Sequence, residues 1–363
     1  MKFQTPRGTR DFLPEDKIKR QRVLDTIRNV FEKWGFDPLE TPAFEDWSLL
    51  SAKQGGGEEI KKEIYYFKDK SDRELGLRFD FTIPLARVVA SNPNLSKPFL
   101  RYQIGPVWRY DRPGAGRYRE FYQADVDVIG APAGSADSLC IAVVCDCLKV
   151  LGFEDFFVRV SSRKIIEAFL LSLEIKKEKI VGVLRSIDKM DKIGEKGVSD
   201  ELKSKDIDMR VIKKILEFIK IKKLQDAKKI VDREKLGQEG INEIEAVLNA
   251  CEAFGIIDFV NFDLSLVRGL EYYTGPVFEV NAGLDISVGG GGRYDNLIQT
   301  MGGKPTPATG ISLGVDRVLL AMQEKKLLKT EKTGVRIYIA SINENVKSDI
   351  ISLARKFVDL GIS

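Results

Sequence analysis

A chain of 363 residues is too long for one ordinary domain, so we expect two or three folded units. It is 43% hydrophobic and 31% charged, a soluble globular balance, and no apolar run approaches the roughly 20 residues of a membrane span. The chain contains no histidine, which excludes Ser-His-Asp catalysis, Cys-His catalysis and any histidine-ligated metal.

The N-terminus and the cysteines indicate the compartment. The opening residues, MKFQTPRGTRDFLP, lack the apolar segment of a secretory signal. Cys140, Cys145, Cys147 and Cys251 are spaced neither as a disulfide framework nor as a zinc site. We therefore expect buried, reduced thiols in a cytoplasmic protein without a metal site of its own.

The first half of the chain predicts a helix followed by strands. Residues 17–36 carry apolar side chains at helical spacing and reach a plausible C-cap at Gly35. Strand-like runs follow at 63–69 and 74–81. Two longer, aromatic-rich runs, 98–111 and 119–130, are joined by RPGAGRY and predict an antiparallel hairpin.

The second half mixes one long helical region with more strands. A helix is expected at 135–151 and a strand at 156–162, and residues 163–250 are almost purely helical in pattern. Strand signals return at 259–267, 276–281 and 308–315, before a helix over 316–326. Strands that surround a helical insertion, with no repeating βαβ pattern, indicate an α+β fold with an antiparallel sheet.

The predicted domains follow from this order. They are a first part of the core at 1–168, a helical insertion at 169–252, a second part of the core at 253–330, and the start of an α/β domain at 334–363. The last segment offers one strand, 335–342, and one helix, 345–360. Because one strand and one helix cannot bury a core, we expect this segment to be incomplete.

Charge is unevenly distributed. The net charge is +4, but residues 174–235 hold 19 Lys and Arg against 13 Asp and Glu. A basic module on a nearly neutral body suggests a polyanionic partner. Solvated helix faces in a Lys-rich protein explain the same pattern. The charge distribution alone favours this explanation over a polyanionic partner.

Several segments carry chemistry. Asp80 and Thr82 lie on one face at a strand end and could bind an ammonium group or cap the next helix, and both interpretations stay open. The hairpin carries several arginines beside Phe121, which suits a nucleoside triphosphate. SVGGGGRYDNLI is neither a Walker A loop nor a dinucleotide fingerprint, and its glycines indicate close approach of a ligand or another strand. Arg317 stands in the first turn of a helix, where the dipole disfavours a cation, so a phosphate contact is plausible.

These segments together resemble one family. RGTRDFLP, WRYDRPGAGRYREFYQADVDVIG, GISLGVDRVLLAM, RGLEYYTG and SVGGGGRYDNL are similar to segments of histidyl-tRNA synthetases, which are class II aminoacyl-tRNA synthetases. The likeness runs from about residue 6 to residue 330. It implies an enzyme, a histidine–tRNA ligase, that activates L-histidine with Mg-ATP and transfers the histidyl group to tRNA(His), as a homodimer and without a membrane partner.

The resemblance also implies roles for particular residues. Arg268 and Arg109 are the implied catalytic cations. The implied histidine-binding residues are Asp80, Phe81, Thr82, Arg109, Gln123, Asp127, Arg268, Tyr272, Tyr273 and Tyr294. The implied ATP-binding residues are Arg109, Arg117, Phe121 and Arg317.

Some features depart from the family pattern and keep an alternative open. Asp111 stands where motif 2 usually has Glu, and the turn RPGAGRY lacks Lys. The implied anticodon-binding domain is represented only by 334–363. The regulatory subunit of ATP phosphoribosyltransferase resembles the same core, binds histidine as a sensor and does not charge tRNA. The set of arginines and the final segment favour the synthetase.

Overall fold

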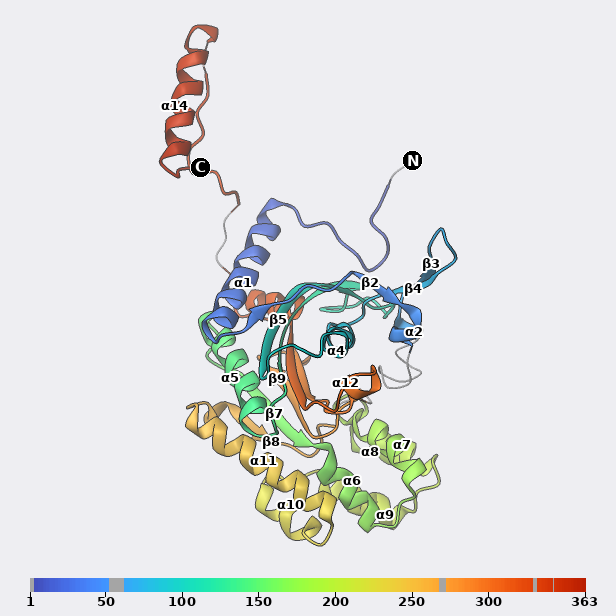
Figure 1. Ribbon diagram of the computed structural model, residues 1–363. Helices are drawn as coiled ribbons and strands as arrows, with labels where there is room; N and C mark the ends of the chain where they lie inside the picture. The colour runs from blue at the N-terminus through green and yellow to red at the C-terminus, as the bar shows by residue number, and fades with distance from the viewer. Residues whose placement is uncertain (1–2, 52–61, 268–271, 329–331, 342) are drawn as a thin grey trace.

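The computed structural model describes residues 3–51, 62–267, 272–328, 332–341 and 343–363 (Figure 1). Within these residues, eight strands form one sheet in the order β1–β5–β6–β11–β10–β9–β7–β8. The strands are β1 (Asp37–Pro38), β5 (Phe99–Trp108), β6 (Glu120–Ile129), β7 (Phe157–Ser162), β8 (Val260–Phe262), β9 (Pro276–Asn281), β10 (Gly289–Arg293) and β11 (Ala308–Gly314). Neighbours run antiparallel except β1 with β5 and β7 with β8, so the expected antiparallel α+β fold is confirmed.

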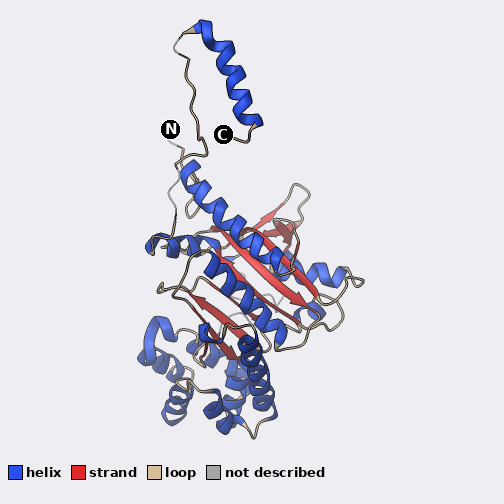
Figure 2. Ribbon diagram, turned by 90° about the vertical axis from the view of Figure 1, so that its left-hand side faces the viewer, coloured by secondary structure: helices blue, strands red, loops and turns tan. Residues whose placement is uncertain are grey.

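Helices cover both faces of this sheet. Figure 1 shows α1 (Pro14–Lys33) and α5 (Ser135–Val150) on one side, with α4 (Thr82–Ser91) and α12 (Leu297–Thr300) on the other. In Figure 2 the long helices α1 and α5 lie in front of the sheet and run in nearly the same direction as the strands behind them. The α5 face is a continuous apolar core because α1, α5 and the inward side chains of the sheet meet there. The opposite face carries the polar residues that matter below.

The predicted hairpin is confirmed. β5 and β6 pair antiparallel from Phe99 opposite Ile129 to Trp108 opposite Glu120. The turn closes with a bridge between Gly114 and Arg117. A second, three-stranded sheet has the order β2 (Phe44–Asp46), β4 (Glu74–Leu77), β3 (Tyr66–Lys68), beside the short α2 (Trp47–Leu50).

Between β7 and β8 the chain is helical. The helices are α6 (Arg163–Ser172), α7 (Lys177–Ile187), α8 (Met190–Lys203), α9 (Met209–Phe218), α10 (Leu224–Val231) and α11 (Lys235–Ala253). The helix α11 packs back against α5 and α6. Figure 1 shows this group below the sheet.

Two strand predictions are wrong in part. The run 259–267 forms the short 3₁₀ turn η1 (Ile257–Phe259) and then only β8, because Asp263 Oδ1 accepts from the backbone N–H of Ser265 and turns the chain. The run 335–341 forms no strand, since no described strand lies beside it to supply a ladder. After the 3₁₀ turn η2 (Glu344–Val346), α14 (Lys347–Asp359) forms as expected but buries no residue. The helix α13 (Val315–Glu324) ends the core as predicted.

Candidate active site

A cavity of about 480 Å³ lies on the polar face of the large sheet. Side chains in β6 alternate between the two faces, as strand geometry requires. Gln123, Asp125 and Asp127 line the cavity, while Ala124 and Val126 between them belong to the apolar core. One strand thus supplies both the floor of the cavity and the core beneath it.

Glycines leave the floor of the cavity free of side chains that would fill it. Asp127 is paired in register with Gly310 of β11, which is paired with Gly292 of β10. A Cβ on Gly310 would lie 2.0 Å from Asp127 Oδ1, and a Cβ on Gly292 would lie 2.9 Å from the Tyr273 ring. Within the glycine run, a Cβ on Gly291 would lie 2.0 Å from the backbone oxygen of Gly310, so the expected close approach of that run to another strand is confirmed. Gly291 and Gly310 both line the cavity.

Asp80 contacts the start of the next helix, one of the two interpretations that the sequence left open. Its Oδ1 accepts a hydrogen bond from the backbone N–H of Ile83, 3.2 Å away, in the first turn of α4. Its Oδ2 is buried and has no hydrogen-bond partner among the described residues. Thr82, which also lines the cavity, hydrogen-bonds Tyr272. One carboxylate oxygen thus caps the helix, and the other remains available to a cation.

Asp127 is the centre of a buried polar group. Tyr294 donates its hydroxyl proton to Asp127 Oδ1, and Arg101 Nη2 lies 2.6 Å from Asp127 Oδ2. Arg101 and Tyr294 are almost completely inaccessible to solvent. The Arg101 contact is an ion pair without good hydrogen-bond alignment, because no guanidinium nitrogen of Arg101 has a hydrogen-bond partner among the described residues. Asp127 is thus a fixed acceptor facing the cavity.

Three arginines reach the cavity from different elements. Arg109 follows β5 and lies 5.4 Å from the centre of the Phe121 ring. Arg117, in the hairpin turn, lies 3.3 Å from Asp111 Oδ2. Arg317 of α13 donates to a backbone carbonyl oxygen 2.9 Å away. Three permanent cations and one aromatic ring in the lining of the same cavity are suited to a nucleotide with several phosphates.

Burial sets the charge state of the carboxyl groups in this cavity. It raises the pKa of Asp80 to about 6 and that of Asp125 to about 8, because a buried carboxylate loses hydration. Burial also raises the pKa of Asp127, while the nearby Arg101 opposes that rise. Three carboxyl groups share one buried space and one buried cation.

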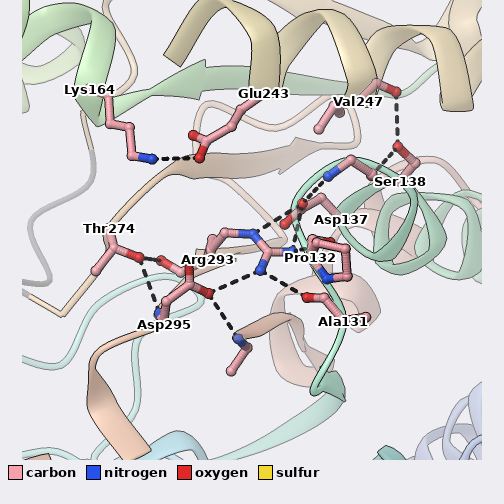
Figure 3. Close-up of polar contacts among 12 residues, drawn as sticks. Ala131, Pro132, Asp137, Ser138, Lys164, Glu243, Val247, Thr274, Arg293 and Asp295 are labelled. Carbon is pink, nitrogen blue, oxygen red and sulfur yellow. Dashed lines mark hydrogen bonds and ion pairs between the residues drawn. The ribbon is translucent and has the colours of Figure 1, made fainter. Parts of the chain in front are cut away.

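A second buried arginine fixes the two segments that carry the tyrosines. Figure 3 shows Arg293, at the end of β10, with its guanidinium donating to Asp137 Oδ2, to Asp295 Oδ1 and to two backbone carbonyls. The backbone N–H of Thr274 donates to the carbonyl of Arg293. Because Tyr273 and Tyr294 are the immediate neighbours of these two residues, the network holds both rings at the cavity wall.

A third arginine joins the helical group to the sheet. Arg159 Nη1, in β7, lies 2.8 Å from Asp191 Oδ2 of α8 and 3.0 Å from Glu279 Oε1 of β9. Its Nε lies 3.1 Å from Asp263 Oδ2, and its Nη2 donates to Ser265 Oγ. The same guanidinium therefore contacts an insertion helix and the turn after β8 that leads toward residue 267.

The structure brings most of the predicted site residues together. Those that line the cavity are Asp80, Thr82, Arg109, Arg117, Phe121, Gln123, Asp127, Tyr272, Tyr273, Tyr294 and Arg317. Phe81 does not line it; this ring is fully buried and faces Arg78. Arg268 lies outside the described residues.

The sequence interpretation assigned no role to several residues that the structure places at the site. Asp188 and Lys192, from the end of α7 and from α8, line the cavity, as do Asp125 and Ser312. Asp125 shares the period-2 face of Phe121, Gln123 and Asp127, so the sequence pattern places it with them, although no role was assigned to it. No local pattern marks Lys192, because the folding of the helices alone brings it to the cavity.

Comparison with known proteins identifies the family. The family described as Histidyl-tRNA synthetase matches residues 8–318. That match covers most of the chain and the whole cavity.

The chain belongs to the histidyl-tRNA synthetase family.

Relatives and solved structures agree. The histidine–tRNA ligase of Pyrococcus furiosus is 38% identical over 98% of this chain and 83% of its own length. That of Aeropyrum pernix is 42% identical over 86% of this chain and 73% of its own length. The crystal structure of histidyl-tRNA synthetase from Nostoc sp. PCC 7120 has a TM-score of 0.85 at 30% identity, over 100% of this chain and 85% of that one.

A further structure has a double description. It is described as an ATP phosphoribosyltransferase regulatory subunit/histidyl-tRNA synthetase from Bacillus halodurans C, with a TM-score of 0.85 at 25% identity over 99% of this chain and 91% of that one. The curated relatives nevertheless support the expected enzyme class, a histidine–tRNA ligase.

Two further observations concern metals and membranes. Within the described ranges, no three His, Cys, Asp or Glu side chains are grouped so that they could hold a metal ion. None of the described helices combines the length and the hydropathy of a membrane span.

Proposed function

We propose that this chain activates L-histidine with Mg-ATP to histidyl-adenylate and transfers the histidyl group to tRNA(His). The observation that carries the proposal is one cavity lined by two chemically distinct sets of groups. Arg109, Arg117, Arg317 and Phe121 form one set, and the other includes a buried carboxylate that accepts from a tyrosine. The family membership supports the same activity.

The chemistry needs no histidine in the protein. The substrate carboxylate arrives ionised and attacks the α-phosphate of ATP, so its bond to phosphorus forms as pyrophosphate leaves. The protein aligns the two groups and neutralises phosphate charge. We assign Arg109 to the α-phosphate and the carboxylate, Arg117 and Arg317 to the outer phosphates, and Phe121 to the adenine ring. Mg²⁺ enters with ATP as part of the substrate.

The carboxylates and tyrosines of the same cavity would select histidine. Asp127 accepts a hydrogen bond from one imidazole N–H, and a tyrosine hydroxyl meets the other nitrogen. The free oxygen of Asp80, with Thr82 and Gln123, receives the α-ammonium group. An amino acid without the N–H would leave Asp127 buried without a hydrogen bond from the ligand. Sites with such an unmatched polar group discriminate strongly between substrates.

The partners belong to the same proposal. We assign 1–168 and 253–330 to the catalytic core, 169–252 to an insertion that binds the tRNA acceptor arm, and 334–363 to the start of an anticodon-binding domain. We propose a homodimer, formed through the catalytic core, in the cytoplasm. Binding of tRNA should then weaken steeply as salt rises, because the basic helices would release counterions from the RNA.

The test is histidine-dependent exchange between ATP and labelled pyrophosphate, followed by charging of tRNA(His) over a range of tRNA concentrations. Exchange that requires histidine, and charging that rises with tRNA concentration, support the proposal. Exchange with other amino acids at equal efficiency would contradict it.

A second candidate is histidine sensing without tRNA charging, which the double description of the Bacillus halodurans structure favours. A sensor would bind histidine but catalyse neither exchange nor charging. Calorimetric histidine binding, measured beside the exchange assay, separates the two functions.

A further inference from the structure

Arg101 is a buried cation directly behind the candidate imidazole acceptor. It stands in β5 opposite Asp127 of β6, in register, and its Nη2 lies 2.6 Å from Asp127 Oδ2. The Arg101 side chain has no exposed surface, and Arg101 is not among the residues that line the cavity. Any influence of Arg101 on a ligand must therefore act through a neighbour.

The two partners of Asp127 leave it able to bind a ligand. Arg101 contacts Oδ2, and Tyr294 donates to Oδ1. An ionised carboxylate offers about four lone-pair sites, so an oxygen with one partner still accepts a second donor. A protonated Asp127 would present a donor instead and would face an imidazole N–H with the wrong group.

Apart from Arg101 and the Tyr294 hydroxyl, the surroundings of Asp127 do not favour its charge. The acidic groups Asp125 of β6, Asp80 before α4 and Cys140 of α5 interact with Asp127, and β11 presents only Gly310 opposite it. Burial raises the pKa of Asp127, and the cation that opposes this rise is Arg101. The buried charge pair with Arg101 is therefore the main interaction, beside the Tyr294 hydrogen bond, that keeps the acceptor ionised.

We propose that Arg101 is a positioning residue that keeps the Asp127 carboxylate ionised and aimed at the imidazole of the substrate. The inference rests on the proposed function and deepens it. An ion pair this deep in the protein stabilises the fold little in net terms, since desolvation offsets the attraction. In this protein the ion pair instead fixes the hydrogen-bond acceptor that selects the substrate.

The experiment uses the full chain with Arg101→Met and measures KM for histidine and for ATP in the exchange assay from pH 6 to pH 9. At pH 7 the histidine KM should rise at least about tenfold over the unsubstituted chain, while the ATP KM changes less than about twofold. Loss of Arg101 should raise the pKa of Asp127 further, so Asp127 regains its charge only at higher pH. The ratio of the histidine KM of Arg101→Met to that of the unsubstituted chain should therefore shrink as pH rises.

Two more variants make the result decisive. Arg101→Lys keeps the charge and loses the fork, so its histidine KM should rise about three- to tenfold with no new pH dependence. Arg78→Met removes another buried arginine, whose partners are backbone carbonyls, and should leave the pH dependence of the histidine KM unchanged.

The outcomes separate this inference from the proposed function. If the unsubstituted chain shows no histidine-dependent exchange, the proposed function fails. If it does, and both Arg101 variants keep its histidine KM at every pH, the positioning role alone is overturned. Arg101→Lys also covers the case in which Arg101→Met does not fold.

Discussion

Substitution of Gly310 by alanine tests the geometry of the cavity floor. The added Cβ would lie 2.0 Å from Asp127 Oδ1, whereas an ordinary contact begins near 3.4 Å. The carboxylate must then move by about 1.4 Å, and it cannot do so while it keeps both Tyr294 and Arg101. Hydrogen bonds to a charged group are worth about 1.5–3 kcal/mol, so we expect a loss of about 3 kcal/mol in histidine binding, on the order of 100-fold.

The assay is calorimetric titration of histidine into the folded variant, with ATP titrated separately. Histidine affinity should fall on the order of 100-fold while ATP affinity stays within about threefold, because the atoms nearest to the added Cβ belong to Asp127 and Val126 and not to the three arginines. Gly105→Ala is the matched control, because Gly105 of β5 lies on the same face of the sheet as Gly310 of β11. Its Cβ would meet neighbours no closer than 3.4 Å. Histidine binding to Gly310→Ala that equals binding to Gly105→Ala would refute the reasoning.

Three further predictions follow from other sites. The pKa of Asp125 is about 8 in the folded protein and about 4 in the unfolded chain, so the free energy of unfolding should fall as pH rises through this range. Between pH 5 and pH 8, urea unfolding should show a smaller fall for Asp125→Asn than for the unsubstituted chain. An equal fall in the two proteins would contradict this prediction. Arg159→Met should lower the unfolding free energy by about 3 kcal/mol, while Asp191→Asn, which removes one exposed partner, should cost less than about 1 kcal/mol; equal thermal shifts would show that the Arg159 contacts do not act together. Arg268→Ala should slow adenylate formation by about 3–4 kcal/mol of transition-state stabilisation while histidine binding persists, and an unchanged single-turnover rate would remove the catalytic assignment.

Local pattern predicted the elements that depend on local chemistry. The alternation in residues 119–130 gave β6 and its polar face, because strand side chains alternate whatever their partners are. The hairpin turn followed from its Gly and Pro residues, and α1 and α5 followed from helical spacing and plausible ends. These segments needed no information about distant residues.

Other features depend on which elements meet in space. Arg101 sits in a strand that is otherwise largely apolar or aromatic, and only the register with β6 reveals its carboxylate partner. Lys192 and Asp191 belong to a Lys-rich helix that looks uniformly solvated in sequence, yet folding directs one to the cavity and the other to Arg159. The segment 335–341 has strand composition, but a strand exists only where another strand pairs with it.

The glycines in the cavity floor also determine where the substrate specificity of this protein could be changed. At Gly291 and Gly310, which line the cavity, the side chain is already the smallest that exists, so substitution there can reduce the cavity volume but cannot increase it. A cavity that accepts a bulkier amino acid must therefore gain its space at the walls, where Tyr272, Tyr273 and Tyr294 offer large rings to shorten. Shortening Tyr294 also removes the hydroxyl that holds Asp127, so enlargement at that wall sacrifices imidazole selection. Tyr272 and Tyr273 are consequently the positions at which size could be changed while the acceptor keeps both of its partners.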